Sequence, residues 1–224
     1  MGARRSRGLS MIELLVGTAI GLIIVAAGTV VVVHHARENR ALVIEARLMQ
    51  DLRTAADIVS RDLRRAGYWA AAASGVRSDD GSAVVANPYA AVRPDTAASD
   101  AVRLSFSRDA SENDVVDSNE QFGFRLRNGA IELQLGSSNW QALTDPATLA
   151  VTAFSVEPHT EETSLAAFCA EPCAAGSLVC PPRQQVRSYA VAISGRSMLD
   201  TNVRRSLLSS VRLRNLAIVG SCEG

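Results

Sequence analysis

The stretch that decides the fold is GLSMIELLVGTAIGLIIVAAGTVVVV, residues 8–33. Residues 14–33 carry no charged side chain, and a helix of that length, rising about 1.5 Å per residue, spans about 30 Å. This is the thickness of the hydrocarbon core of a bilayer. The stretch therefore predicts a helix that crosses a membrane, with a single acid, Glu13, near its start.

A short basic segment, MGARRSRG, precedes this helix. Under the positive-inside rule Arg4, Arg5 and Arg7 stay in the cytoplasm, and the rest of the chain crosses the membrane. An ordinary secretory signal has a shorter apolar region and a small-residue cleavage site behind it. Here the apolar run leads into His34 and His35 without such a site. We therefore expect a single-pass membrane anchor, with the C-terminus on the side of the membrane away from the cytoplasm.

The helical pattern continues beyond the apolar run, because no Gly or Pro occurs between Gly28 and Gly67. Apolar residues recur at intervals of three and four, which is typical of an amphipathic helix. They are Ala41, Ile44, Leu48, Leu52, Ala55, Val59, Leu63 and Ala66. Arg64 and Arg65 suit the negative end of a helix, and Gly67 suits a left-handed cap. The pattern predicts one continuous helix over residues 9–66.

Glu13 requires an explanation, because burying one charge in a medium of low dielectric constant costs several kcal/mol unless a partner is near. Cleavage of the chain after Gly8 would create a positive amine at Leu9, four residues before the acid. That amine, in the same chain or in a neighbouring subunit, would be the partner. The simpler alternative is that the carboxylate reaches the lipid headgroups.

At these residues the sequence resembles the type IV pilins and the related pseudopilins. Their leader is a short basic peptide that ends in Gly, followed by a residue that is usually Phe, a T/S-L-I-E-like motif and a long apolar helix. Residues 8–13 match this pattern, with Leu9 in the place of the Phe. Many major pilins kink the helix with a proline, whereas the first proline here is Pro88. The resemblance implies cleavage between Gly8 and Leu9 by a prepilin peptidase, N-methylation of Leu9 and a role of Glu13 in assembly.

A second stretch, DIVSRDLRRAGYWA at residues 57–70, resembles the L-x-R-D-L-R-x-A-G-Y-W segment of PilW-type minor pilins. The matching residues are Arg61, Asp62, Leu63, Arg64, Ala66, Gly67, Tyr68 and Trp69. RRSLLSSVRLRN at residues 204–215 is similar to the final strand of the same group. On sequence grounds alone, the charged residues of the first motif could equally form a solvated helix face. Tyr68 and Trp69 more often close the edge of a core than bind a ligand.

Beyond Gly67 the pattern changes to loops and short strands. The strongest signal is a hairpin around Asn128-Gly129, which would pair Leu126 with Ile131, Phe124 with Leu133 and Phe122 with Leu135. Its apolar face would bind the amphipathic part of the helix, so we expect an α+β fold, and the resemblance implies the pilin fold. The expected parts are a leader (residues 1–8), a transmembrane half-helix (9–33), an amphipathic half-helix (34–67) and a periplasmic head (68–224) with loops at 70–99 and 158–185.

Four cysteines, Cys169, Cys173, Cys180 and Cys222, allow three disulfide connectivities. In each of them Cys222 joins one of the other three, which would fasten the C-terminal segment to the loop that carries them. Zinc is the alternative, but the spacing is a poor match to paired C-x2-C knuckles, and disulfides suit a periplasmic domain. Calcium binding by Asp79-Asp80 or Glu161-Glu162 is a weaker alternative. We name no metal site.

Charge and motifs narrow the function further. The chain has 23 basic and 23 acidic residues and no recognisable nucleic-acid module, so nucleic acid is not an expected partner. The motifs of metalloproteases, serine hydrolases and nucleotide-binding loops are missing, so we expect neither an enzyme nor a cofactor. The resemblance implies a minor pilin that helps to start a type IV pilus at its tip. Its partners would be other minor pilins, the major pilin, the prepilin peptidase, the inner-membrane assembly platform, membrane lipid before assembly and a tip adhesin.

Two other functions remain open. The nearer is a minor pseudopilin of type II protein secretion, which shares the anchor and the fold. The farther is a membrane-anchored periplasmic enzyme or binding module that uses the helix only as a tether.

Overall fold

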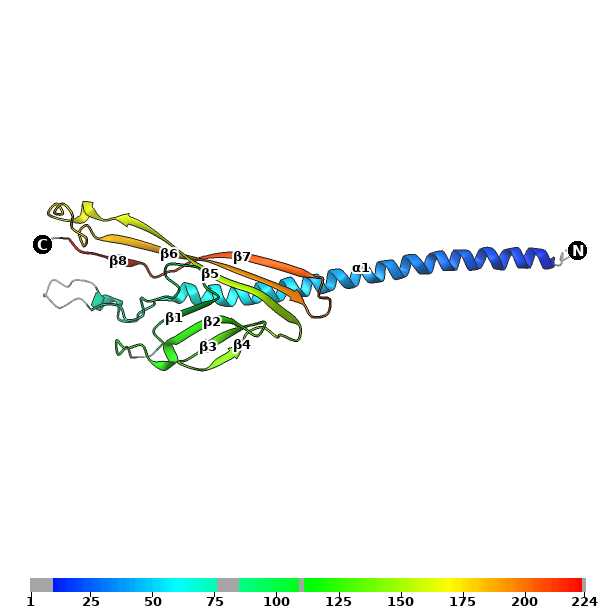
Figure 1. Cartoon of the computed structure of the whole chain (residues 1–224), viewed down its shortest axis with the longest axis horizontal. Coiled ribbons are helices and arrows are strands. Elements are labelled where there is room, and N and C mark those ends of the chain that lie inside the picture. The colour runs from blue at the N-terminus through cyan, green and yellow to red at the C-terminus, as the bar shows by residue number, and fades with distance from the viewer. Residues whose placement is uncertain (1–9, 76–84, 109–110, 223–224) are drawn as a thin grey trace, which may run out of the picture. The chain divides into compact units, whose positions relative to one another are not determined.

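The computed structural model describes residues 10–75, 85–108 and 111–222. One long helix, α1 (Met11–Arg65), begins where the peptide N–H groups of Glu13 and Leu14 donate to the carbonyl oxygen of Ser10 (Figure 1). It ends just before Gly67, whose φ of 76° is left-handed. Glycine adopts this conformation without a steric penalty, which is why it so often terminates helices. The prediction of a long helix that ends at Gly67 is therefore confirmed.

The chain divides into two compact units, residues 1–44 and residues 45–224, which we describe separately. In the first unit, large apolar side chains are exposed on all faces of α1, among them Leu14, Leu22 and Val30. By length and composition α1 is able to cross a membrane. A helix that is apolar all round needs lipid or other helices around it. The boundary between a transmembrane half and an amphipathic half of the helix stays a prediction.

The second unit contains two antiparallel sheets. Sheet A has the order β1 (Ala101–Ser105), β2 (Gln121–Arg127), β3 (Ala130–Leu135) and β4 (Trp140–Ala142). The predicted hairpin is confirmed in its register, which pairs Phe122 with Leu135, Phe124 with Leu133 and Leu126 with Ile131. Asn128 and Gly129 both have positive φ, 50° and 75°, as the two-residue turn requires. Leu135, at the end of β3, is 40% exposed, so the buried face stops before it.

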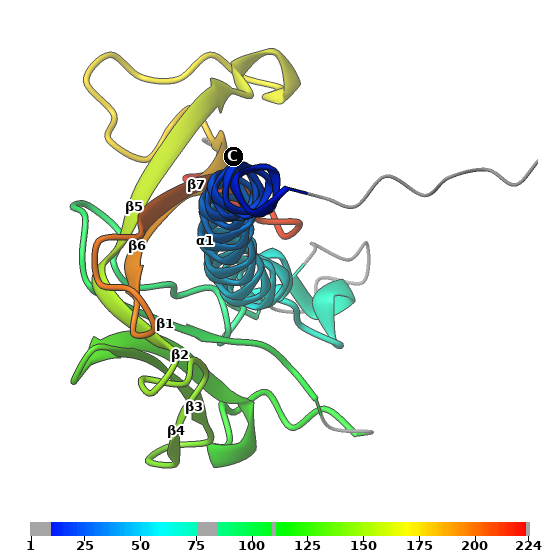
Figure 2. The same ribbon diagram turned by 90° about the vertical axis from the view of Figure 1, so that its right-hand side faces the viewer.

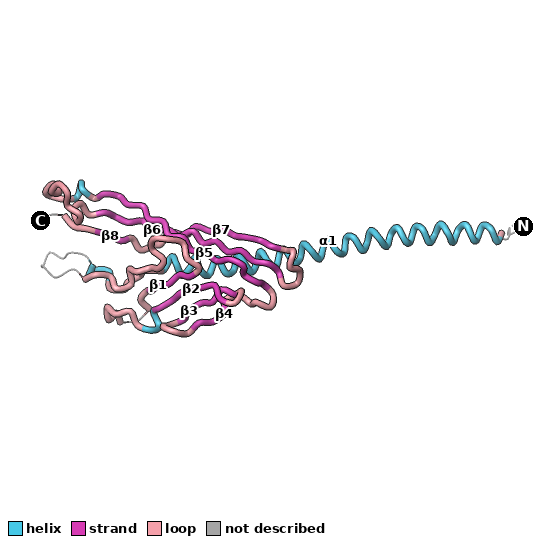
Figure 3. The backbone as a smooth tube through the Cα atoms, viewed as in Figure 1, coloured by secondary structure: helices cyan, strands magenta, loops and turns pink. Residues whose placement is uncertain are grey.

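Sheet B consists of β5 (Leu149–Ser164), β6 (Arg183–Ser197) and β7 (Arg204–Arg212) in that order, and β8 (Ala217–Val219) pairs with the start of β6. Figure 3 shows the long ribbon that β5 and β6 form. Short 3₁₀ helices, η1 (Ala72–Gly75), η2 (Ser118–Glu120) and η3 (Ala166–Phe168), lie in the connections.

The expected loop over residues 158–185 is wrong at both ends, because β5 continues through Pro158 to Ser164 and β6 begins at Arg183. The N–H and C=O of Val156 bond to Ser99, on the side of β5 away from β6. Peptide groups alternate in direction along a strand, so the nitrogen of Pro158 also points away from β6. The missing N–H therefore removes no bond between β5 and β6, and an edge strand can contain this proline.

The core of the second unit lies where α1 meets both sheets. Leu48, Leu52, Val59 and Leu63 on the helix are at most 2% exposed, and they belong to one cluster with apolar side chains of β1, β2, β3, β5 and β6. Burial of each leucine stabilises the fold by about 1.5–3 kcal/mol. Figure 2, viewed along α1, shows the strands of both sheets on one side of the helix. This amphipathic stripe against antiparallel sheets confirms the α+β, pilin-like architecture.

Gly195 allows β6 to lie close to its neighbours. A Cβ atom at this position would lie 2.5 Å from Cδ1 of Leu149 and 3.4 Å from Cδ2 of Leu52. Any larger residue would therefore force the side chain of Leu149 to move.

Candidate functional site

Glu13 lies in the first turn of α1, and its side chain is exposed. It has no ion-pair partner among the residues that the structure describes, whereas the two threonines farther along the helix are satisfied within it. The hydroxyl of Thr18 donates to the carbonyl oxygen of Leu15, and that of Thr29 to Val25. The carboxylate of Glu13 is thus the one polar side chain from residue 11 to residue 33 without a partner in the helix. Gly8 and Leu9, the predicted cleavage and methylation positions, lie outside the described residues.

The motif at residues 61–69 forms the junction between the end of α1 and the head. Gly67 donates its N–H to the carbonyl oxygen of Ser105, 2.9 Å away, and its own carbonyl oxygen accepts from Nδ2 of Asn87 at 2.9 Å. A Cβ atom at this glycine would make ordinary contacts at 3.6 Å with Asn215 and with the guanidinium of Arg187, so the left-handed φ, and not a lack of space, is what favours glycine here. The left-handed turn at Gly67 therefore joins the helix to β1 and to the segment around Asn87.

The C-terminal motif meets the first motif at the same junction. Asn215 donates from Nδ2 to the carbonyl oxygen of Ala66 at 2.9 Å, and the N–H of Arg214 donates to the carbonyl oxygen of Arg64 at 3.2 Å. The last carbonyl groups of a helix have no partner within the helix itself. Residues about 150 positions away in the sequence satisfy them here. The two stretches that carry the resemblance to minor pilins are thus in direct contact.

Individual motif residues differ in their surroundings. Leu63, Ala66 and Trp69 are buried, and Nε1 of Trp69 donates to Oδ1 of Asp114 at 2.8 Å. Asp62 is only 5% exposed and accepts a hydrogen bond from Nε of Arg61, so a fully solvated face does not describe it. Arg61, Arg64 and Tyr68 are exposed. The guanidinium of Arg65, the residue after Arg64, lies 4.2 Å from the ring centre of Phe106.

Sequence reasoning missed a buried carboxylate beside this junction. Glu120 is fully buried, and its Oε2 accepts hydrogen bonds from the hydroxyl of Tyr89 at 2.8 Å and from the N–H of Asp117. Its Oε1 accepts from the N–H of Arg108. Burial, followed by the hydrogen bonds to Glu120 and Glu112, raises the pKa of Tyr89 well above its usual value. No local pattern in the sequence indicates this pair, because its members are 31 residues apart and Glu120 is one of several acids in its loop.

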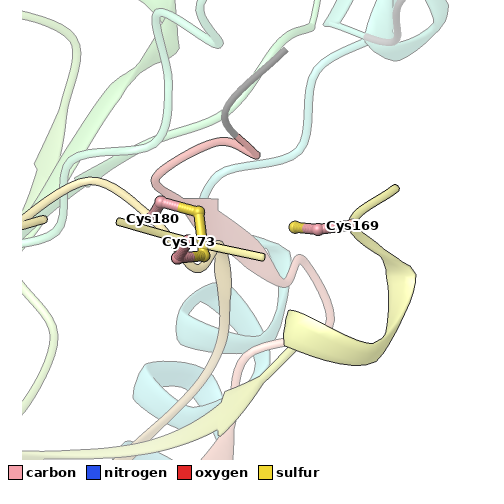
Figure 4. A group of neighbouring side chains, drawn as sticks. All are labelled: Cys169, Cys173 and Cys180. Carbon is pink, nitrogen blue, oxygen red and sulfur yellow. A yellow bond between two sulfur atoms is a disulfide. The ribbon is translucent and has the colours of Figure 1, made fainter. Parts of the chain in front are cut away.

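The four cysteines form two disulfides, Cys169–Cys222 and Cys173–Cys180. This is one of the three connectivities that the sequence left open. The first fastens the segment after β8 to the loop between β5 and β6, and the second closes a small ring in that loop. The sulfur atoms of Cys169, Cys173 and Cys180 lie within 4.8 Å of one another (Figure 4). All four sulfurs are consumed in S–S bonds, so none is a thiolate that could bind a metal.

The acid pairs that we considered as calcium ligands either lie beside other polar side chains or lie outside the described residues. Glu162 bonds to Gln185 at 2.7 Å and lies 3.4 Å from Arg183, and Glu161 is exposed beside His159. Asp79 and Asp80 lie outside the described residues. The described geometry is therefore that of a junction, which fixes the C-terminal end of α1 to the head.

A comparison with protein families matches residues 41–213 to the model described as prepilin peptidase-dependent protein B. Comparisons with curated proteins and with solved structures returned no significant match. The matched range covers most of the chain and begins after the leader and the apolar run, so it is independent of the motif at residues 8–13. It includes the helix end, both sheets except β8, and most of the C-terminal motif. The chain therefore belongs to the prepilin peptidase-dependent protein B family and is a type IV pilin-like protein.

Proposed function

We propose that this protein is a PilW-like minor pilin that takes part in starting and assembling a type IV pilus, at or near its tip. The proposal is supported by membership in a family of prepilin peptidase-dependent proteins. It is further supported by the contact between the helix-end motif and the C-terminal motif, which both resemble those of PilW-type minor pilins. Its role is non-enzymatic and requires no cofactor.

The proposed function implies the following steps for the subunit. It is made as a prepilin in the bacterial inner membrane, with residues 1–8 in the cytoplasm and the head in the periplasm. The prepilin peptidase cleaves between Gly8 and Leu9, and the new amine of Leu9 is methylated. The subunit then leaves the lipid for the pilus on the cell surface.

One observation carries the proposal: from residue 11 to residue 33, α1 presents apolar side chains on all faces, and the one acid there, Glu13, has no partner among the described residues. In lipid such a helix is stable but its charge is costly. In a bundle of like helices, the apolar faces pack against neighbours, and the carboxylate pairs with the amine of Leu9 on the same or an adjacent subunit. The ion pair therefore favours the assembled state over the lipid state.

The partners proposed for this process are other minor pilins, the major pilin, the prepilin peptidase and the inner-membrane assembly platform. A tip adhesin is a further candidate. These partners would meet the subunit through α1 before assembly and through α1 and the head afterwards.

The test is a deletion strain, scored for surface pili, twitching motility and secreted enzymes together. Loss of pili and twitching with normal secretion is expected, and complementation with the intact chain should restore both. Loss of secretion with normal pili would instead assign the protein to type II secretion as a minor pseudopilin. Normal pili and normal secretion would overturn both assignments.

A further inference from the structure

Sheet B has a free edge at β7. The strand order ends at β7, which runs along the border of the sheet (Figure 1). The N–H of Leu213 donates to Arg187, and the carbonyl oxygen of Val203 accepts from Ser197, so odd-numbered residues face β6. Peptide groups alternate in direction, and the N–H of the even-numbered Arg214 indeed points the other way, to Arg64 of the helix. Even-numbered residues of β7 therefore direct their N–H and C=O outward.

These outward groups are unpaired along most of the strand. The carbonyl oxygen of Arg204 accepts from its neighbour Arg205. For Ser206, Leu208, Ser210 and Arg212, the structure contains no backbone hydrogen bond on the outer side within the described residues. All four residues are exposed, and the side chain of Leu208 is 73% exposed. A row of unpaired donors and acceptors with regular spacing is the surface to which an extended peptide adds as a further strand.

The other edge of sheet B is protected, which makes β7 unusual. Along β5, Val151 bonds to Gly129 and Val156 bonds to Ser99 on the outer side, and Pro158 removes a donor. The edge strands β4 and β8 have three residues each. In β7, by contrast, residues 206–211 contain no proline, glycine or charge. Natural sheets normally protect long edges with such features unless the edge binds a partner.

Charge indicates which kind of strand fits. Arg204 and Arg212 stand at the two ends of the uncharged segment, and neither has an ion-pair partner among the described residues, whereas Arg205 is paired with Glu45. A second copy of β7, added antiparallel about Leu208, would place Arg204 of each chain beside Arg212 of the other. Like charges directly opposite each other destabilise a strand pair. This disfavours a symmetric dimer and favours an acidic partner.

We propose that the outer edge of β7 binds an extended strand of a different protein, with acidic residues at both ends and small or apolar residues between them. The partner strand would extend sheet B through the peptide groups of Ser206, Leu208 and Ser210, while its acids pair with Arg204 and Arg212. This goes beyond the helix-based assembly proposed above and does not depend on it.

The test uses the full chain in detergent micelles and two fluorescent peptides that share a Thr-Val-Thr-Val-Thr centre. One peptide has a pair of glutamates at each end, and the other has a pair of arginines. We expect the glutamate peptide to bind at least about tenfold more tightly, with an affinity that falls with salt. The double variant Arg204→Glu/Arg212→Glu should reverse the preference. Arg127→Glu, which changes an exposed arginine at the end of β2, is the matched control and should leave it intact.

A second pair of variants tests the backbone. Leu208→Pro removes the outward N–H without removing a bond to β6, and it should weaken binding about tenfold. Leu208→Ser keeps that N–H and should cost less than about threefold. Amide hydrogen exchange gives an answer even if the proline variant does not fold: the glutamate peptide should slow exchange at Ser206, Leu208, Ser210 and Arg212 of the unmodified chain. Equal affinity for the two peptides, no saturable binding, unchanged exchange at these amides, or a dimer through β7 would each overturn the inference.

Discussion

At the scale of single residues, Asn215 shows how a distant side chain completes a helix. Its amide donates to the carbonyl oxygens of Ala66 at 2.9 Å and of Arg65 at 3.5 Å. We expect Asn215→Ala to lower the free energy of unfolding by about 1–2 kcal/mol, because the carbonyl oxygen of Ala66 loses its side-chain donor. Urea unfolding of the full chain in micelles measures this. Asn202→Ala, at an exposed turn, is the control, and an equal effect of the two changes would contradict the assigned role.

Tyr89 makes a prediction about pH. The folded state keeps its phenol protonated because the pKa is raised by burial and by Glu120, whereas an unfolded tyrosine releases its proton near pH 10. The folded state therefore binds more protons above that pH, and stability is complete below about pH 10 and falls as pH rises further. In Tyr89→Phe this alkaline loss should be smaller, and stability at neutral pH should fall by about 1–3 kcal/mol, since Glu120 loses a donor. Unfolding curves at pH 7 to 11 give both quantities.

Two features keep this prediction specific. The pKa of Tyr189 is also raised, chiefly by burial, so part of the alkaline loss should remain in the Tyr89→Phe protein. Tyr68 is half-exposed, and Tyr68→Phe should leave the stability at neutral pH unchanged. An identical pH profile for the Tyr89→Phe and original chains would show that Tyr89 does not carry the effect.

Glu13 belongs to the same scale, although its effect is on assembly. Glu13→Ala should insert normally in the membrane, because removing a charge from an apolar helix lowers the cost of insertion. Incorporation into pili should fall strongly, since the amine of Leu9 loses its proposed partner. Immunoblots of membrane and sheared surface fractions measure the two steps. Glu38→Ala is the matched control on the same helix, and normal incorporation of Glu13→Ala would refute the ion-pair mechanism.

At the scale of elements, the two disulfides close loops of very different length. Cys169–Cys222 spans 53 residues and Cys173–Cys180 spans 7. On the chain-entropy account, the longer loop stabilises the fold by about 4 kcal/mol and the shorter by about 2.5 kcal/mol. The double variant Cys169→Ser/Cys222→Ser should therefore be less stable than Cys173→Ser/Cys180→Ser. Each removes both sulfurs of one bridge, so no free thiol confuses the urea unfolding curves, and the reverse order would contradict the account.

The same scale shows what the sequence could predict. The hairpin at Asn128-Gly129 was correct in register because its signal is local: two turn residues fix the pairing of the strands beside them. The length of β5 was missed because Pro158 and the acids after it have the composition of a loop. Whether a proline is tolerated there depends on which way its nitrogen faces, and the neighbouring strands determine that.

The candidate site also has features that the sequence predicts and features that only the packed structure shows. The helix-end motif was found from its resemblance, and the position of Gly67 followed from helix-capping rules. The contact between Ala66 and Asn215, the buried pair of Tyr89 and Glu120, and the choice among disulfide connectivities all join residues distant in sequence. Side-chain chemistry alone does not fix such pairings, because each residue has several possible partners until the sheets and the helix are packed.

At the scale of the whole molecule, the processing of the chain governs every later step. If the peptidase cleaves after Gly8, the mature chain loses the residues before Leu9. Mass spectrometry of N-terminal peptides from the protein in pili should show an N-terminus at Leu9 with one added methyl group. In the proposed mechanism, cleavage exposes the amine that pairs with Glu13, so uncleaved protein should stay in the membrane fraction.

A pair of chimaeras then separates anchoring from assembly. Replacing residues 9–33 by an unrelated transmembrane segment should keep the head folded in the periplasm, because its core lies within residues 45–224, but it should abolish incorporation into pili. Replacing the same residues by the corresponding segment of a major pilin should preserve incorporation, since such a segment keeps the acid and the apolar surface. If the unrelated segment supports normal piliation, α1 is only a tether, and the helix-packing mechanism fails for the whole molecule.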